Sequence, residues 1–369
     1  MTARFPCPGC AADLEFDPRA GRMKCPYCGT EASVPAEALS RTIHEHDLHA
    51  YLTPETVQLA RLAENALEVA CESCGAVTEF TPPEVAGFCP FCAAKIVAQP
   101  VAADPLIAPE GVLPFAIPKK DAVAAMKKWL GTRWFAPSAL KNMARQDGIY
   151  GVYLPYWTYD AQTISRYSGE RGEHYYETER YSETDQNGRI VWKERQVQKT
   201  RWYRASGTVA RLFDDILVPA TRSVSEPRLN GLEPWDLQAL VPYEPAYLSG
   251  FKAQRYQLDL GSGNEKARSI MAGVIHSDVR SDIGGDEQRV HQIATDYSAE
   301  TFKHILLPVW IAAYRFESKV FQVLINARTG EVQGERPYSI WKIAALVLFI
   351  IVTIALFVWW QQGQEKPPV

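Results

Sequence analysis

Eight cysteines in four Cys-x-x-Cys pairs constrain this chain more than any other feature of its 369 residues. Each cysteine of the first two pairs lies 64 positions before its counterpart in the last two, so the pairs form an internal repeat. The pairs are Cys7/Cys10 with Cys25/Cys28, and Cys71/Cys74 with Cys89/Cys92. This spacing predicts two zinc ribbons, each holding one structural zinc ion in a closed tetrahedral site of four cysteines.

A redox dithiol is the alternative for such pairs, but that chemistry needs one pair in a βαβ context, which four pairs at repeat spacing do not provide. No cysteine is left over to act as a nucleophile. The N-terminal residues contain no apolar segment of a secretory signal, so we expect a reducing compartment in which the thiols bind metal. Each ribbon is too small to fold on apolar burial alone, and we expect the metal to contribute on the order of 10–16 kcal/mol.

A second strong signal is the apolar run at residues 343–360, in which Thr353 is the only polar side chain. Its 18 residues would extend about 27 Å as a helix, close to the thickness of a bilayer core. A buried core helix is the alternative, although such helices seldom lack every charge. Because Arg328, Arg336 and Lys342 precede the run, the positive-inside rule predicts that the bulk of the chain lies in the cytosol, with a single-pass anchor in the cytoplasmic (inner) membrane.

The predicted fold class is multidomain α+β: two small four-cysteine zinc ribbons, a mainly antiparallel β middle domain with short helices, and one C-terminal transmembrane helix. Helical spacing at Leu59, Leu62, Ala66 and Val69 predicts a helix between the ribbons. The predicted divisions are ribbon 1 at 1–35, a helical spacer at 36–69, ribbon 2 at 70–98, a linker at 99–111, a β-rich domain at 112–339, the membrane helix at 340–360 and a short outer tail at 361–369.

Within the β-rich domain, the pattern Leu-Pro-x-Trp occurs at Leu154–Trp157 and at Leu307–Trp310, which we interpret as equivalent strand entries in a weak duplication. Asn187-Gly188 predicts the turn of a long hairpin rich in aromatic residues. Helices are expected at Lys119–Leu130 and Glu265–Arg280, with strands at Arg289–Tyr297 and Tyr314–Asn326.

Three further segments are weaker candidates for chemistry. His44–His49 lacks the His-Glu-x-x-His spacing; His46 and His49 could share an ion, but a solvated helix face is the simpler interpretation. Gly261–Lys266 resembles a phosphate loop without its second glycine and its Ser or Thr, so a flexible loop is expected. Asp214-Asp215 offers paired carboxylates that nothing else distinguishes from a turn. We therefore predict a protein without catalytic residues, and not an enzyme.

Charge argues against nucleic acid as the partner of the ribbons. Residues 1–100 carry seven basic and thirteen acidic side chains, a net charge of −6, whereas phosphate binding needs clustered Lys or Arg. The aromatic hairpin could stack bases, but its charges nearly cancel. Protein binding is the favoured interpretation for both.

The chain resembles a family of bacterial membrane-anchored TFIIB-type zinc-ribbon proteins of phage-shock and SPFH-associated systems. The resemblance is carried by the Cys-Pro-[Tyr/Phe]-Cys knuckles at Cys25–Cys28 and Cys89–Cys92, the two Leu-Pro-x-Trp motifs, and the stretch Leu324–Pro337 before the anchor. Relatives are often labelled primosomal replication factor Y or superfamily II helicase-like, but this sequence has neither a nucleotide loop nor an Asp-Glu-x-His box. The resemblance implies SPFH (flotillin-like) or PspA/ESCRT-III-like cytosolic partners.

Two main hypotheses follow. The first is a non-enzymatic membrane adaptor that recruits cytosolic proteins to the inner face of the membrane in envelope stress. The second is a nucleic-acid-binding ribbon protein, associated with replication or a helicase and tethered to the membrane. A hydrolase with an unrecognised site in the β domain is a weaker third.

Overall fold

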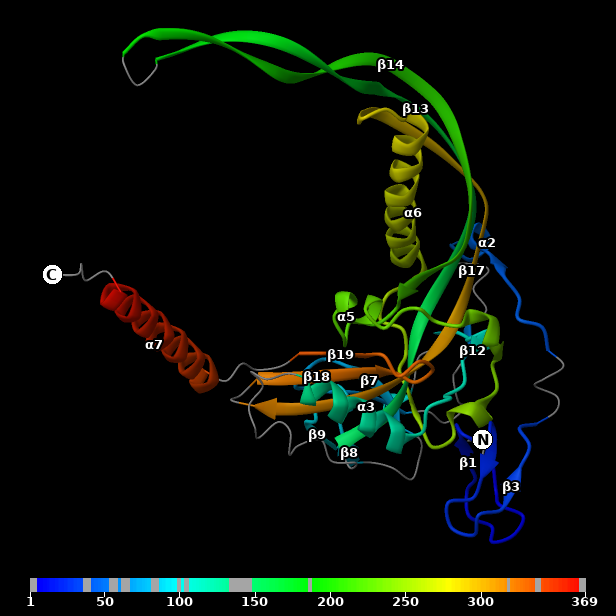
Figure 1. Ribbon diagram of the computed structural model, residues 1–369. Helices are drawn as coiled ribbons and strands as arrows, with labels where there is room; N and C mark the ends of the chain where they lie inside the picture. Colours follow the sequence, from blue (N-terminus) through cyan, green and yellow to red (C-terminus); the bar gives the residue numbers. More distant parts are fainter. Residues whose placement is uncertain are drawn as a thin grey trace.

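The computed structural model describes residues 5–35, 41–52, 59–60, 67–80, 86–97, 101–102, 106–132, 148–184, 188–316, 319–335 and 340–364. It shows the predicted fold class: two clusters of four cysteines, a mainly antiparallel β domain and one apolar C-terminal helix (Figure 1). One helix of the β domain is longer than expected, at 24 residues.

The elements before the long strands are short. They are β1 (Glu15–Asp17), β2 (Arg22–Lys24), β3 (Glu31–Ala32), β4 (His46–Asp47), α2 (Leu48–Leu52), β5 (Leu59–Ala60), β6 (Leu67–Ala70), β7 (Val77–Phe80), β8 (Ala86–Phe88), β9 (Lys95–Val97), β10 (Val101–Ala102), β11 (Leu106–Ile107), β12 (Gly111–Val112) and α3 (Lys119–Gly131).

The remaining elements build the large sheet, its covering helices and the C-terminal helix. They are β13 (Ile149–Thr184), β14 (Ile190–Pro219), α5 (Glu226–Asn230), η2 (Leu237–Ala239), β15 (Val241–Pro242), η3 (Pro245–Leu248), β16 (Lys252–Ala253), α6 (Leu260–Ile283), β17 (Glu287–Phe316), β18 (Lys319–Asn326), β19 (Val332–Gly334) and α7 (Ile340–Gln364).

The helix expected between the ribbons is not formed in the described part of that segment. Leu59–Ala60 is strand β5, and Leu67–Ala70 is strand β6 of the second ribbon, where Val69 lies opposite Thr78. Two of the four positions that suggested a helix, Leu59 and Val69, therefore lie in strands, and Leu62 and Ala66 lie outside the described residues. The predicted helices at Lys119–Leu130 and Glu265–Arg280 are confirmed as α3 and α6.

Three very long strands organise the molecule. β13 has 36 residues, and β14 and β17 have 30 each. They pair antiparallel in the order β14-β13-β17, and they run from the core at one end into a curved arm that projects from it (Figure 1). The long hairpin expected from Asn187-Gly188 is confirmed, but it begins far earlier in the chain than its aromatic segment suggests.

The two Leu-Pro-x-Trp motifs lie inside these strands rather than at their starts, so the prediction of strand entries is wrong. Pro155 lies where pairing of β13 passes from the short parallel strand β16 to the antiparallel strand β14. Pro308 lies where pairing of β17 passes from the short parallel strand β12 to the antiparallel strand β18. At each junction, no residue of a neighbouring strand that the structure describes is in position to accept a hydrogen bond from a backbone N–H. Proline has no N–H, so it is tolerated here inside the sheet.

The same junction geometry supports the predicted duplication. The Pro155 carbonyl accepts from the N–H of Ala220 at 3.0 Å, just past the end of β14. The Pro308 carbonyl accepts from the N–H of Ala327 at 3.1 Å, just past the end of β18. The motifs also meet across the β13–β17 ladder, where Leu154 lies opposite Leu307.

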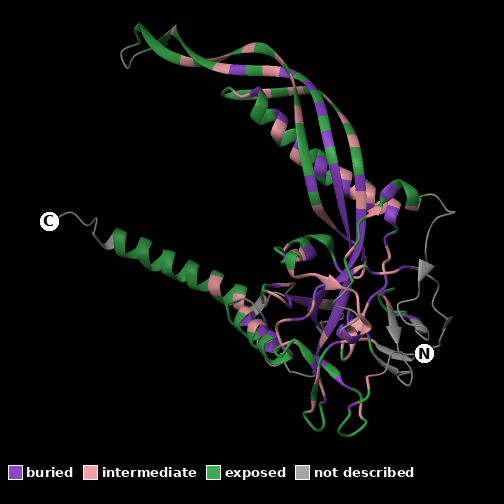
Figure 2. Ribbon diagram, turned by 90° about the vertical axis from the view of Figure 1, so that its right-hand side faces the viewer, coloured by how far each residue is buried: buried purple, intermediate pink, exposed green. Residues whose placement is uncertain are grey.

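Helix α6 covers one face of the arm. Its buried residues Gly263, Ala267, Met271, Ile275, Val279 and Ile283 recur every four positions. They pack on the side chains of odd-numbered residues of β13, and the Tyr159 hydroxyl donates to the Leu260 carbonyl at 2.8 Å. The even-numbered residues Gln162, Ile164, Arg166 and Ser168 face away from the helix and are exposed, so the arm shows alternating burial along β13 (Figure 2).

The C-terminal helix α7 stands apart from the rest of the molecule (Figure 1). Its segment Lys342–Gln361 has a mean hydropathy of 2.8 and none of it is buried inside the protein. The buried-core alternative is therefore not what the structure shows. By length and composition, this helix is able to cross a membrane.

Substitution of two glycines of α6 can test how closely the helix packs against the arm. A methyl group at Gly263 would lie 2.3 Å from the Tyr159 hydroxyl, whereas at Gly273 it would meet nothing within 4 Å. We expect Gly263→Ala to lower the free energy of unfolding by about 1–3 kcal/mol because of overpacking. Gly273→Ala should raise it by about 0.5–1 kcal/mol because of helix propensity. Denaturant titration of the detergent-solubilised chain checks both; equal effects would contradict the packing described.

Candidate metal centres

Four knuckles of one design position the cysteines. In each, the N–H of the first cysteine donates to the carbonyl five residues later, at 2.6 Å for Cys7 and 2.9 Å for Cys25 and Cys71. The N–H of the residue after the second cysteine donates back to the first cysteine's carbonyl, and that residue has a positive φ. These residues are Ala11 (61°), Gly29 (76°), Gly75 (70°) and Ala93 (57°). Glycine suits this position because it has no Cβ penalty there, and two of the four positions are glycine.

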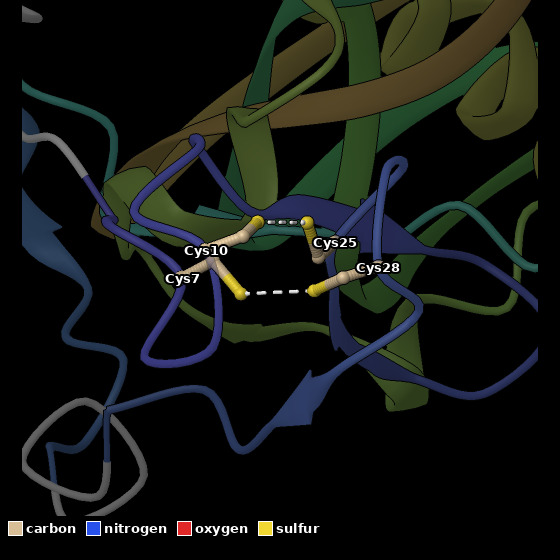
Figure 3. Close-up of side chains that lie close together, drawn as sticks. All are labelled: Cys7, Cys10, Cys25 and Cys28. Carbon is tan, nitrogen blue, oxygen red and sulfur yellow. Dashed lines mark hydrogen bonds between the residues drawn. The ribbon is translucent and has the colours of Figure 1, made fainter.

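The knuckles meet in two groups of four sulfur atoms, as predicted. In the first ribbon, Cys7 lies 3.5 Å from Cys28 and Cys10 lies 3.5 Å from Cys25 (Figure 3). In the second, Cys71 lies 3.5 Å from Cys92 and Cys74 lies 3.7 Å from Cys89. All four sulfurs of each group lie within 4.8 Å of one another. A disulfide would bring two sulfurs to about 2 Å, so these are thiols.

The donor sets fit a tetrahedral metal ion. Metal–sulfur bonds of about 2.3 Å at tetrahedral angles separate the sulfurs by about 3.8 Å, close to the distances found. The donor chemistry also fits, because metal binding requires thiolates. The Thr30 hydroxyl, 3.1 Å from the sulfur, lowers the pKa of Cys28 to about 6. A hydrogen bond from Cys74 lowers the pKa of Cys89 to about 5, and the same bond raises the pKa of Cys74. Two structural metal ions are compatible with these sites.

Each ribbon is fastened to the β domain and is not an isolated unit. In the first, the Phe16 ring packs edge-on against Tyr247 at 5.2 Å, and the Ser249 hydroxyl donates to the Leu14 carbonyl at 2.6 Å. In the second, the buried Gln322 of β18 donates to the Phe91 carbonyl at 2.6 Å. The β domain therefore supplies apolar burial that the ribbons lack by themselves, and the metal is not their sole source of stability.

The two sites differ in exposure. Cys10 and Cys28 of the first are exposed, whereas only Cys74 of the second is. Ligand exposure gives a chelator access to the metal, but it does not change the donor set.

The histidine segment is a solvated helix face only at His49, whose side chain is 68% exposed on α2. His46 belongs to strand β4, where its Nε2 atom lies 2.8 Å from Glu110 and its ring contacts Tyr51 and Phe302. His49 reaches Glu300, which also accepts from Arg268. The two histidines therefore fasten the β4–α2 segment to the sheet through separate carboxylates.

The expected loop at Gly261–Lys266 is the first part of helix α6. The Asp259 carboxylate caps the helix by accepting from the backbone N–H and the hydroxyl of Ser262, both at 2.8 Å. The backbone N–H bond holds the pKa of Asp259 below its usual value. This carboxylate occupies the anion position at the helix N-terminus, so the segment is not built to hold a phosphate.

Asp214 and Asp215 lie beside Asp160, which the sequence did not single out. The three surround a bulge where β13 shifts register against both neighbours. Lys303 places its ammonium 2.8 Å from Asp215 and 3.0 Å from Glu45. Burial opposes its charge, but the hydrogen bonds to these carboxylates raise the pKa of Lys303. The ammonium of Lys303 therefore balances the negative charge of these carboxylates at the base of the arm.

Comparison with known proteins adds one relative of unknown function. The chain is similar to Uncharacterized protein YdjG of Bacillus subtilis (strain 168), with 26% identity over 355 residues that cover 94% of this chain and 93% of that protein. No protein-family model matches the chain, and no solved structure matches it. The similarity therefore extends over most of the length of both chains.

The exposure difference predicts the order of metal loss. With a chelating dye in excess, we expect two ions to leave the zinc-loaded chain, one clearly faster than the other, with the fast phase belonging to the first ribbon. The variant Cys10→Ser/Cys28→Ser should lose that fast phase and keep the slow one. Cys74→Ser/Cys92→Ser is the matched variant at the second ribbon and should lose the slow phase. Loss of the phases in the opposite order would contradict the exposure argument.

Proposed function

We propose that this chain is a non-enzymatic, membrane-anchored adaptor whose arm binds cytosolic proteins and holds them at the inner face of the cytoplasmic membrane. Helix α7 serves as the anchor. The basic residues before it keep the β domain and the ribbons on the cytosolic side. Both four-cysteine sites hold zinc in a structural role.

The observation that carries this proposal is the uncovered face of the arm. The side opposite α6 exposes large apolar side chains in two groups, one near its base and one near its tip, although the sheet face under α6 is buried. From the base to the tip these are Leu212 (69% exposed), Ile164 (51%), Tyr176 (65%), Trp192 (69%) and Ile190 (70%). Apolar side chains gathered on one face of a sheet, and left uncovered by the elements that the structure describes, are typical of a protein-binding surface.

The electrostatics of the arm favour protein over nucleic acid as the ligand. Several of its basic side chains are engaged by carboxylates of the same arm, as in Lys199 with Glu177 and Arg180 with Glu194, both at 2.7 Å. Arg211 is held by Asp278 of α6 at 2.6 Å. Phosphate binding depends on basic groups free to displace counterions, and these are already paired.

The class of partner that we propose comes from the resemblance of the sequence to membrane-anchored zinc-ribbon proteins. SPFH (flotillin-like) or PspA/ESCRT-III-like proteins are cytosolic proteins that work at membranes, and an adaptor fixed by α7 would raise their local concentration there. Envelope stress is the setting that the resemblance implies.

A pull-down of the full chain from detergent-solubilised membranes tests this function. We expect Ile164→Asp/Leu212→Asp to reduce recovery of SPFH-like or PspA-like proteins at least tenfold, because two charges would be buried in the interface. Ile270→Asp is the control, since Ile270 is 43% exposed on α6 and not on the proposed face. Undiminished recovery by the double variant would contradict the assignment of the face. Recovery of nucleic acid that falls steeply with salt would favour a nucleic-acid tether instead.

A further inference from the structure

The outer part of the arm is a two-stranded ribbon with an unusual distribution of charge. The third strand, β17, starts at Glu287 opposite Gly172, and beyond that point the structure pairs β13 with β14 alone. Residues Glu173–Thr184 of β13 lie opposite Ile190–Arg201 of β14, twelve residues on each strand. We call this segment the distal ribbon.

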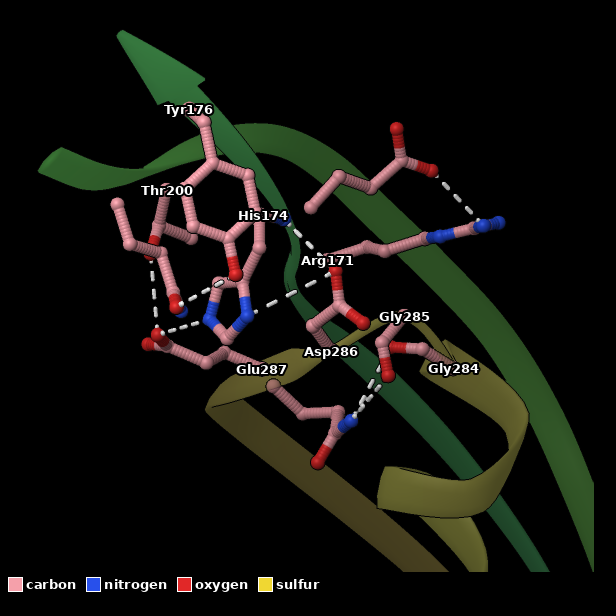
Figure 4. A network of polar contacts seen from close by, with 11 residues as sticks. Arg171, His174, Tyr176, Thr200, Gly284, Gly285, Asp286 and Glu287 are labelled. Atoms are coloured by element: carbon pink, nitrogen blue, oxygen red, sulfur yellow. Dashed lines mark hydrogen bonds and ion pairs between the residues drawn. The ribbon is translucent and has the colours of Figure 1, made fainter. Parts of the chain in front are cut away.

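The base of the distal ribbon is fixed by a polar network (Figure 4). The N–H of His174 donates to Asp286 at 2.7 Å, and its ring nitrogen lies 2.8 Å from Glu287. Glu287 also accepts from the Thr200 hydroxyl at 3.0 Å. This network joins the start of β17 to both strands of the ribbon. It therefore fixes the position at which the three-stranded sheet becomes a two-stranded ribbon.

The two strands of the distal ribbon carry opposite charge. On β13, four glutamates against one arginine give a net charge of −3; on β14, four basic residues against one glutamate give +3. The two exceptions, Arg180 and Glu194, lie opposite each other and pair. The other charges are Glu173, Glu177, Glu179 and Glu183 on β13, and Lys193, Arg195, Lys199 and Arg201 on β14.

All eight of these charges lie on one face. Glu173 is opposite Arg201, and Glu179 is opposite Arg195, so the odd-numbered residues of both strands form one charged surface. Cross-strand ion pairs join the strands there, including Lys193 with Glu183 at 2.7 Å. One edge of the ribbon is therefore acidic and the other basic.

Both edges are long and unpaired in the part of the chain that the structure describes. A two-stranded ribbon is marginal alone, and three strands or a covering helix are normally needed for stability. Here about 40 Å of strand, at 3.3 Å per residue, has neither. Charged side chains protect such edges against pairing with an identical edge, because like charges then lie side by side. They give no such protection between an acidic edge and a basic one.

We propose that the distal ribbons of two copies of this chain pair edge to edge, the acidic strand β13 of one against the basic strand β14 of the next. Each basic strand then lies between two acidic strands, and antiparallel pairing continues across the chains because β13 and β14 run in opposite directions. The contact is heterologous, so it extends into a row of arms. Anchoring through α7 gives all copies the same orientation relative to the membrane, as such a row requires. The edges are distinct from the uncovered apolar face, so the row stands independently of partner binding there.

A charge swap separates contacts within a chain from contacts between chains. The six substitutions Glu177→Lys, Glu179→Lys, Glu183→Lys, Lys193→Glu, Arg195→Glu and Lys199→Glu exchange the charges of the two strands and keep the pairs within each chain. Swapped chains should pair with one another. A swapped chain beside a native one would instead place like charges on adjoining strands, in both possible orders.

The experiment co-expresses full-length chains with two different affinity tags and measures co-purification in mild detergent. We expect native with native and swapped with swapped to co-purify, and native with swapped to fall at least tenfold. If swapped chains do not associate, chains reversed only on β13 and chains reversed only on β14 should still co-purify with each other. Failure of both combinations would overturn the proposal. So would an absence of native co-purification, or equal recovery of native with swapped, which would place the contact in α7 or on another face.

Discussion

The pairing of β13 with β17 is the interaction on which the rest of the molecule depends. It begins where Ile149 meets Ala312 and continues, with two register shifts, until Gly172 meets Glu287. Because the same ladder runs through the core and the arm, the two cannot move as separate bodies without breaking it. The ribbons, the short parallel strands and helix α6 all attach to one of these two strands or to their immediate neighbours.

The burial of β13 changes at the bulge beside Asp160. Below it, β13 is buried on both faces; above it, only the residues that face α6 are buried. Asp160 accepts from the backbone of Asp215 at 2.6 Å and from Thr301 at 3.0 Å, so it ties β13 to both neighbouring strands at the point of irregularity. Lys303 and Glu45 then connect the same point to the N-terminal segment through β4. The polar cluster is a structural joint at the base of the arm.

The sequence predicted both four-cysteine clusters because ligand spacing is a local property, and two knuckles of the same spacing fold in the same way. It also predicted the hairpin, which the pairing of Thr184 with Ile190 confirms, although Asn187 itself lies outside the described residues. Most of its failures are non-local. The spacing of apolar residues predicts a helix at Val69, but Val69 pairs with Thr78 in a β-ladder and is therefore extended. Pro155 suggests a strand start, but its tolerance depends on where β16 and β14 end, which no local pattern reveals. The partners of His46 and Lys303 lie tens or hundreds of residues away for the same reason.

Native-state hydrogen exchange of the full chain in detergent tests most directly whether core and arm are one body. The account predicts strong amide protection that continues along β13 from Tyr153 through the bulge to Tyr167, with matching protection on the facing residues of β17. If protection ended at Asp160, and the amides between Gln162 and Gly169 exchanged as fast as those of an unfolded chain, the arm would not be a continuation of the core. The description of its faces and edges would then fail.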